Sequence, residues 1–240
     1  MILHDDETLT RVNDNIELIQ KKDGLTFGTD AYLLSAYMRE GKSSVAVDYG
    51  CGTGIISLLC AARGRFKKIY AVDVQAEFCD VAKRNCLYNR LDSVEVIHSD
   101  VRELKLEADV VFTNPPYMKV TSGKANESSA KNIARHEVCG DINDFMASAC
   151  RVLRFGGFFY AVYRTDRLID LLDAMRKNSI EPKRMTFVHA TKEHQPSMVL
   201  VEGKRGGKAG LIITKPLFME GTDIDYIYEK GEFPDEFCIK

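Results

Sequence analysis

Strand-like and helix-like segments alternate along most of this 240-residue chain, and this alternation limits the possible folds more than any other feature. Runs of β-branched and aromatic residues, which favour strands, occur at 45–47, 68–72, 94–97, 110–112 and 157–162. Helical patterns occur near 55–63, 76–89, 141–153 and 166–178. Strands that alternate with helices form a parallel sheet covered on both faces. Right-handed crossovers then place ligands at the carboxyl ends of the strands.

The pattern changes after residue 180, where strand-like runs at 185–189, 198–201 and 210–213 follow one another without a helix. A short strand near 16–19 and a helix near 30–38 precede the alternation. We therefore predict an α/β fold with a doubly wound, mostly parallel, seven-stranded Rossmann-like sheet and an antiparallel C-terminal edge. The expected single domain, 1–240, has an N-terminal strand and helix extension (1–44), a core (45–218) and an acidic tail (219–240).

The composition excludes several classes of protein. It is 45% hydrophobic and 28% charged, as in a folded globular protein, and no apolar run approaches the ~20 residues of a membrane span. The acidic N-terminus lacks the order of a signal peptide. Seven cysteines without a C-x-x-C pair predict neither disulfides nor a metal site, and they favour the reducing cytoplasm. The oligomeric state is not determined, and a monomer is the simpler expectation.

The charge distribution leaves two interpretations open. The net charge is only −2, yet residues 119–208 contain 16 Lys and Arg against 10 Asp and Glu, a local excess of six positive charges. Such a segment suits a polyanion such as RNA. Ordinary solvated helix faces would give the same count.

A glycine turn follows the first core strand. Gly50, Gly52 and Gly54 permit a tight turn and the close approach of a ligand to the backbone. Their G-x-G-x-G spacing differs from the G-x-G-x-x-G of dinucleotide-binding folds, and Asp48 precedes the first glycine by two residues. That carboxylate would repel a pyrophosphate and attract a cation. S-adenosylmethionine, which carries an ammonium and a sulfonium, therefore fits better than NAD.

Two further acids follow the next two predicted strands. Asp73 ends its strand 19 residues beyond Gly54, where a carboxylate can accept hydrogen bonds from both ribose hydroxyls. Asp100 follows the strand at 94–97 and can accept from an adenine amino group, with Val101 packing on the ring. A single acid of this kind is more often a surface or capping residue. Acids at three successive strand ends beside a glycine turn indicate a nucleoside-containing cofactor.

The strand at 110–112 stops at Asn114-Pro115-Pro116-Tyr117. Two prolines cannot donate to a sheet, and each favours an extended conformation in the residue before it. The Asn114 side chain and the neighbouring carbonyls are therefore held at a strand tip beside an aromatic ring. Carbonyl acceptors and a stacking surface suit a planar group that carries an NH2. A proline turn without function is the alternative interpretation.

The glycine turn and the Asn-Pro-Pro-Tyr motif together resemble the class I S-adenosylmethionine-dependent methyltransferases that modify exocyclic or amide nitrogens. Within them, residues 9–218 resemble the bacterial tRNA1(Val) adenine-37 N6-methyltransferase family. The pieces specific to that family are residues 27–34, 134–137, 156–159, 163–168 and 182–185. One departure is Tyr49-Gly50-Cys51, where many relatives have other residues around the first glycine.

The resemblance implies N6-methylation of a tRNA adenine, at position 37 of the anticodon loop of tRNA-Val, with S-adenosyl-L-homocysteine as the product. Asn114, Pro115 and Tyr117 would be catalytic: the first two accept hydrogen bonds from the amine and Tyr117 stacks on the base. Substrate contacts would include Tyr117, Lys119, Arg135 and His136, although a neutral, partly buried histidine that joins the loop to the core is the alternative interpretation of His136. Weaker candidates for phosphate contacts are Lys183, Arg184, Arg164 and Arg167. The expected cofactor-binding residues are Thr29, Asp48, Gly50, Gly52, Gly54, Asp73, Val74, Asp100, Val101 and Asn114.

Four other functions remain open. Release-factor methyltransferases hold a glutamine amide with the same tetrapeptide, but their helical N-terminal domain would need more than the ~44 residues before the first core strand. A DNA adenine methyltransferase would need a target-recognition domain. Guanine-N2 methylation of RNA is possible, because that base also has an exocyclic amine. A non-catalytic module that binds the cofactor or RNA is the last alternative, and the intact motifs argue against it.

Overall fold

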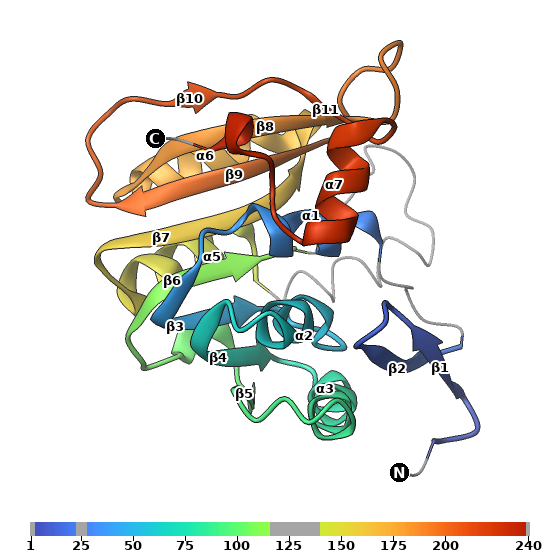
Figure 1. The fold of residues 1–240 in the computed structure, drawn as a ribbon. Helices are drawn as coiled ribbons and strands as arrows, with labels where there is room; N and C mark the ends of the chain where they lie inside the picture. The colour runs from blue at the N-terminus through green and yellow to red at the C-terminus, as the bar shows by residue number, and fades with distance from the viewer. Residues whose placement is uncertain (1–2, 23–27, 116–139, 239–240) are drawn as a thin grey trace, which may run out of the picture.

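A central mixed sheet organises the protein, for which a computed structural model describes residues 3–22, 28–115 and 140–238 (Figure 1). The nine strands of this sheet follow the order β10-β8-β9-β7-β6-β3-β4-β5, and β11 pairs with β8. Their bounds are β3 Gly41–Tyr49, β4 Phe66–Asp73, β5 Val94–His98, β6 Ala108–Thr113, β7 Leu153–Arg164, β8 Ile180–His189, β9 Met198–Arg205, β10 Ile212–Ile213 and β11 Leu217–Phe218.

The predicted sheet is confirmed in its main features. Strands β5, β4, β3, β6 and β7 are parallel neighbours, and β9 pairs antiparallel with both β7 and β8. Two details differ from the prediction. The antiparallel strand β9 lies between β7 and β8 rather than at the outer edge, and the two-residue strands β10 and β11 raise the strand count from seven to nine. Strand β10 lies within the run predicted at 210–213, whereas the two-residue strand β11 is too short to carry a periodic pattern in the sequence.

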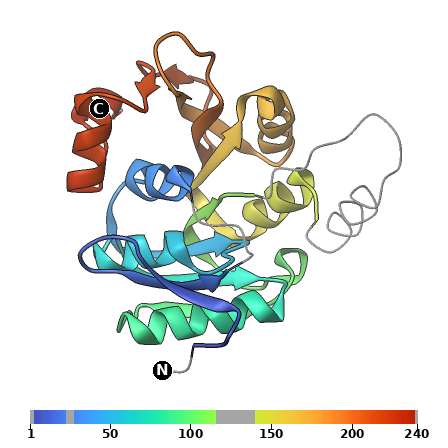
Figure 2. The same cartoon turned by 90° about the vertical axis from the view of Figure 1, so that its right-hand side faces the viewer.

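Helices cover both faces of the sheet, as the alternation predicts. Helices α1 (Thr29–Tyr37), α2 (Ile55–Ala62) and α3 (Ala76–Tyr88) pack on one face, and α5 (Ile142–Val152) and α6 (Leu168–Lys177) pack on the other (Figure 2). Successive residues of β3 serve opposite faces, so Ala46 packs with α1 and α2 while Val47 packs with α5. Burial on both faces explains why the core strands are continuous apolar runs.

An N-terminal hairpin forms a separate two-stranded sheet beside α3. It consists of β1 (Glu7–Arg11) and the predicted strand β2 (Glu17–Lys21). Asn85 of α3 accepts from the amide of Ile19 at 2.7 Å and donates to its carbonyl at 3.0 Å. Asn89 makes the same pair of bonds with Glu17, at 3.1 Å and 2.8 Å. The spacing of Asn85 and Asn89 along α3 matches that of Ile19 and Glu17 along β2, because four helical residues rise about 6 Å and two strand residues about 6.8 Å.

The C-terminal segment expected as an acidic tail is packed onto the domain, so that prediction needs correction. Helix α7 (Thr222–Lys230) lies beside α1 (Figure 1). Ile224, Ile227, Phe233 and Phe237 are buried in the same cluster as α1. The negative net charge of this segment gave no sign of its apolar face, because the acids of α7 lie on the side of the helix away from the domain.

A buried ion pair holds the C-terminal segment at Phe237. The guanidinium of Arg184 lies 2.9 Å from the Glu202 carboxylate and donates to the carbonyls of Tyr37 at 2.7 Å and Phe237 at 3.0 Å. Arg184 is 1% exposed, so it cannot contact phosphate as the sequence led us to expect. In the described ranges, no helix has the length and apolar character needed to cross a membrane.

Candidate cofactor and methyl-acceptor site

The register of the sheet aligns the carboxyl ends of four strands. Tyr49, the last residue of β3, pairs with Val72 of β4 and with Thr113 of β6. Asp73 at the end of β4 pairs with His98 at the end of β5. The turns that follow these strands therefore open at one edge of the sheet, as predicted, and this edge holds the glycine turn and the start of the Asn-Pro-Pro-Tyr motif.

The glycine turn requires its glycines for conformational reasons. Gly50, Gly52 and Gly54 have φ angles of 68°, 54° and 85°, in the left-handed region that strains other residues. The amide of Gly50 donates to the carbonyl of Val72 at 2.9 Å, which fixes the turn against β4. A Cβ added at Gly50 or Gly52 would meet no atom of the described residues within 4 Å. The space beside these two residues is therefore open, as a ligand that approaches the backbone requires.

Asp48 lies buried beneath this turn with one oxygen unsatisfied. The hydroxyl of Ser57 donates to its Oδ2 at 2.7 Å, whereas Oδ1 has no hydrogen-bond partner among the described residues. Burial raises the pKa of Asp48 to about 7, the bond from Ser57 opposes this rise, and the nearby charge of Asp73 adds to it. A buried acceptor without a donor is costly. The turn thus contains an acceptor suited to a cationic or hydrogen-bonding ligand.

Asp73 ties the end of β4 to the glycine turn. Its Oδ2 accepts from the amide of Gly52 and its Oδ1 from the amide of Gln75, each at 2.9 Å. Burial raises the pKa of Asp73, and these backbone bonds oppose the rise. Each carboxylate oxygen has a second lone pair, so the group can still accept from ribose hydroxyls. Val74, the next predicted residue, is half-buried, and its carbonyl is hydrogen-bonded to the ring of His98 at 3.0 Å.

Asp100 has a partner that the sequence reasoning missed. It caps the short helix η1 (Val101–Glu103), accepts from the amide of Arg102 at 2.8 Å, and forms an ion pair with its guanidinium at 2.5 Å. Arg102 lowers the pKa of Asp100. An adenine amino group would share this carboxylate with the guanidinium. Val101 is 6% exposed and packs in the core on the α5 side, so it presents little surface to a ring.

Asn114 follows β6 directly and presents an unsatisfied oxygen. Its Nδ2 donates to Oδ2 of Asp30 at 2.7 Å, while its Oδ1 is buried and has no partner in the described part of the chain. The hydroxyl of Thr113 donates to the carbonyl of Tyr49 at 2.9 Å and holds the strand tip against β3. Pro115, the second predicted acceptor residue, is buried. The side-chain acceptor predicted from the sequence is therefore present and free to accept.

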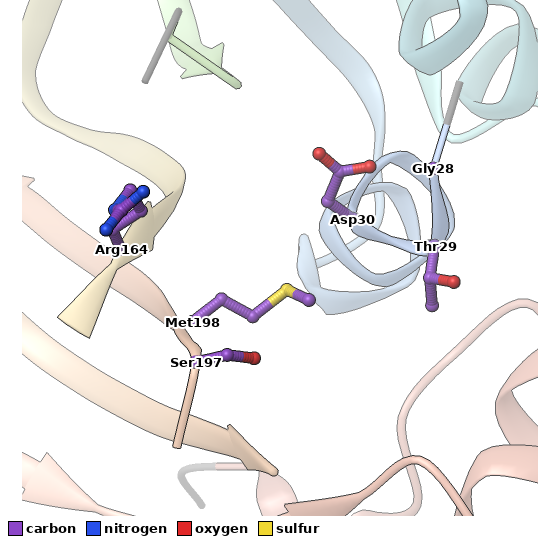
Figure 3. Close-up of a pocket in the computed structure, with 6 residues that line it drawn as sticks. All are labelled: Gly28, Thr29, Asp30, Arg164, Ser197 and Met198. Carbon is purple, nitrogen blue, oxygen red and sulfur yellow. The ribbon is translucent and has the colours of Figure 1, made fainter. Parts of the chain in front are cut away.

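A pocket of about 320 Å³ adjoins Asp30 (Figure 3). It lies between the start of α1, the end of β7 and the start of β9, and is lined by Gly28, Thr29, Asp30, Arg164, Ser197 and Met198. The volume is at the lower end of the range for small-molecule sites. Thr29, a predicted cofactor contact, lines this pocket, and the guanidinium of Arg164 forms an ion pair with Asp166 at 2.6 Å. The only sequence feature that pointed to Asp30 or to this pocket is the stretch 27–34, which resembles the tRNA1(Val) methyltransferase family.

Four predicted residues, Tyr117, Lys119, Arg135 and His136, lie outside the described residues. Their roles as stacking, phosphate-binding and substrate contacts stay predictions.

Comparison with known proteins decides the family. The methyltransferase small domain family matches residues 21–178, which include the glycine turn and Asn114. The chain belongs to this family. Among curated members of the methyltransferase family, the tRNA1(Val) (adenine(37)-N6)-methyltransferase of Phocaeicola vulgatus is 32% identical over 180 residues, covering 74% of this chain and 76% of the relative. The enzyme of the same name from Dyadobacter fermentans is 28% identical, covering 84% and 82%. This methyltransferase chain therefore belongs with the tRNA1(Val) (adenine(37)-N6)-methyltransferases.

Solved methyltransferase structures share the fold. A predicted O-methyltransferase from Agrobacterium tumefaciens superimposes with a TM-score of 0.68 at 19% identity, covering 85% of this chain and 98% of that one. TYW2 from M. jannaschii in complex with AdoMet gives 0.58 at 17% identity, covering 85% and 88%. At these identities the likeness concerns the methyltransferase fold alone.

Proposed function

We propose that this methyltransferase transfers a methyl group from S-adenosylmethionine to the N6 amino group of an adenine in tRNA, with position 37 of the anticodon loop of tRNA-Val as the target. One observation carries the proposal: at a strand tip beside the glycine turn, Asn114 presents a buried acceptor oxygen that has no hydrogen-bond partner among the described residues. The relatives at 26–32% identity are named for this reaction, and their likeness covers most of the chain.

The residues at the strand ends fit the cofactor. The open space beside Gly50 and Gly52 admits a ligand against the backbone, and the unsatisfied oxygen of Asp48 suits its cationic part. Asp73 would accept from the ribose hydroxyls, and Asp100 from the adenine amino group. Thr29 and Val74 would complete the walls of this site, whereas Val101 offers little surface to it. When bound, S-adenosylmethionine supplies an electrophilic methyl group on a sulfonium sulfur.

The protein contributes to the transfer by orienting the amine. The lone pair of an adenine N6 is delocalised into the ring, which makes the amine a weak nucleophile. Hydrogen bonds from its two N–H groups to Asn114 Oδ1 and the Pro115 carbonyl favour a tetrahedral nitrogen whose lone pair points at the methyl carbon. Fixed acceptors of this kind contribute about 3–4 kcal/mol each if values for oxyanion holes apply. The alkylated nitrogen is acidic and releases one proton, so no dedicated base is needed.

The tRNA would supply the base in an accessible form. An anticodon loop is single-stranded, so turning one base out of its stack costs little. Tyr117 would stack on the base, a contact worth ~1–3 kcal/mol. Lys119, Arg135 and His136 would contact the RNA around it. The described cysteines are all free, which agrees with a reducing cytoplasm as the place of action.

The proposal is tested by identifying the product. Incubating the protein with labelled S-adenosylmethionine and unmodified bulk tRNA, then digesting the RNA, should give labelled N6-methyladenosine. Labelled N2-methylguanosine, or label confined to a protein glutamine, would replace the proposed substrate with one of the alternatives. Absence of heat on titration with the cofactor would indicate a non-catalytic module. Asn114→Ala should lose turnover even at cofactor concentrations that saturate the variant, and near-normal turnover with the cofactor bound would refute the role of its oxygen.

A further inference from the structure

Asp30, at the start of α1, is the partner of the Asn114 amide, although the two residues are 84 positions apart in sequence. We propose that Asp30 is a positioning residue for methyl transfer: it fixes which way the Asn114 amide faces and increases the negative charge on its oxygen. This inference deepens the function proposed above and depends on it. No sequence motif assigns such a role to Asp30, and the contact becomes visible only in the folded chain.

The orientation argument follows from the hydrogen-bonding capacity of the two groups. An ionised carboxylate only accepts hydrogen bonds, so the Asn114 amide must turn its NH2 group toward Asp30, where Nδ2 lies 2.7 Å from Oδ2. The amide oxygen then faces the other way and is left as a buried acceptor to which no residue of 3–22, 28–115 or 140–238 donates. Without Asp30 the two amide orientations differ little in energy. In the reversed orientation an NH2 would face the N–H groups of the substrate, and the acceptor would be lost.

Asp30 also affects the strength of the acceptor. A charge-assisted bond to Nδ2 polarises the amide and makes Oδ1 a better acceptor, because hydrogen bonds in a chain strengthen one another. The amine nitrogen gains positive charge as it is methylated. The negative charge of Asp30 reaches that nitrogen through the Asn114 amide, so it stabilises the transition state more than the ground state. A faster step requires this difference.

The fold holds the Asp30 carboxylate in place. Its Oδ1 accepts from the amide of Ala31 at 2.9 Å, in the first turn of α1, where a negative charge is favourable. Gly28 leaves room for this arrangement, because a Cβ added there would lie 2.8 Å from Asp30 Oδ1. The φ angle of Gly28 is −103°, so backbone strain does not require a glycine at this position. In Figure 3 the Asp30 carboxylate projects from the start of α1, and Arg164, Ser197 and Met198 line the same pocket from the strands opposite.

The first test compares two matched alanine variants. Helices α1 and α7 both have nine residues and both begin Thr-Asp, so Asp223→Ala removes a first-turn carboxylate that pairs with Lys215 at 3.0 Å instead of with Asn114. We expect Asp30→Ala to lower kcat by roughly 10- to 100-fold, less than loss of a whole acceptor. Its dissociation constant for S-adenosylmethionine should stay within about threefold of the wild type. Asp223→Ala should leave kcat unchanged, and thermal unfolding of both variants separates folding from catalysis.

The second test exchanges the two side chains. Asn114→Asp alone sets two carboxylates against each other at hydrogen-bond distance, which is unfavourable. The double variant Asp30→Asn/Asn114→Asp restores one donor and one acceptor, with an oxygen still free for the amine. We expect the double variant to be at least tenfold more active than Asn114→Asp. A merely structural role of Asp30 predicts no such rescue. Gly28→Ala, which displaces the carboxylate without removing it, should lower kcat severalfold.

The results separate this inference from the proposed function. The wild-type product is identified first, and the variants are compared on whichever amine the wild type methylates. A product other than N6-methyladenosine would overturn the proposed substrate, and the variant ratios would still decide the role of Asp30. Asp30→Ala with kcat within twofold of the wild type, or a double variant no more active than Asn114→Asp, would overturn the positioning role.

Discussion

Replacing Asn85 by alanine should weaken both the N-terminal hairpin and cofactor binding. The Asn85 side chain is fully buried and makes three hydrogen bonds: two to the backbone of Ile19 in β2 and one, at 3.0 Å, to the carbonyl of Thr53 in the glycine turn. It thus joins a hairpin strand, helix α3 and the turn proposed to hold the cofactor.

The magnitude follows from the groups that lose a partner. Asn85→Ala removes three hydrogen bonds worth about 1 kcal/mol each, and it leaves the amide and carbonyl of the buried Ile19 unpaired. We expect a loss of about 3–5 kcal/mol in the free energy of unfolding, a large share of the ~5–15 kcal/mol typical of a domain. At about 2–4 °C per kcal/mol, Tm should fall by roughly 10 °C. Release of the Thr53 carbonyl should weaken cofactor binding by about tenfold, or ~1.4 kcal/mol.

The assay pairs urea unfolding with calorimetric titration of S-adenosylmethionine, and Asn89→Ala is the matched control. Asn89 holds Glu17 of the same strand in the same way, one helical turn further on, and its side chain also donates to the carbonyl of Asn85 at 2.8 Å rather than to the glycine turn. It is half-buried, so we expect a smaller loss of about 1–2 kcal/mol and unchanged cofactor affinity. The reasoning is refuted if Asn85→Ala unfolds within 1 kcal/mol of the wild type, or if both variants weaken binding equally.

Two further predictions concern pH. The pKa of Asp48 is raised from 3.8 to about 7 in the folded state, so between these pH values the folded protein binds more protons than the unfolded chain. The free energy of unfolding therefore falls as pH rises from about 4 to about 7. Asp48→Asn should therefore gain in Tm relative to the cofactor-free wild type from about pH 5 to about pH 7 and then level off; parallel Tm curves would contradict this. Conversely, Arg84 lowers the pKa of the buried Glu7 to about 2, so the stability from this pair is present above about pH 4.5 and is lost on acidification. Glu7→Gln should lower the free energy of unfolding in urea by about 1–3 kcal/mol at neutral pH, and by progressively less toward pH 2. Asp80→Asn removes the exposed partner of the same Arg84 and should cost under ~0.5 kcal/mol. Equal losses in the two variants would show that burial of Glu7 does not strengthen its pair with Arg84.

The architecture was predictable because its signals are local. Continuous apolar runs separated by helical patterns indicate a two-sided parallel sheet, and this sheet is present. The glycine turn was predictable because left-handed φ angles favour glycine, and Gly50, Gly52 and Gly54 have such angles. The position of Asn114 was also predictable, since two prolines end a strand wherever they occur.

Contacts between distant segments were not predictable from such signals. The acids of α7 suggested a solvated tail, because a charge count does not show which side of a helix is buried; Ile224 and Ile227 pack against the domain. Arg102 was missed as the partner of Asp100, although it lies only two residues away, because the ion pair depends on the local turn of η1. Arg184 looked like a phosphate contact and is instead buried against Glu202.

The sequence by itself determined the order of strands and helices, the glycine turn, and the tip at which Asn114 sits, because backbone sterics and hydrophobic periodicity act over a few neighbouring residues. Only the tertiary structure decided which way the Asn114 amide faces and what holds the cofactor turn. Asp30 is 84 residues from Asn114, and Asn85 is 66 residues from Ile19. A hydrogen bond requires two groups within about 3 Å, and folding sets that separation for residues far apart in the chain.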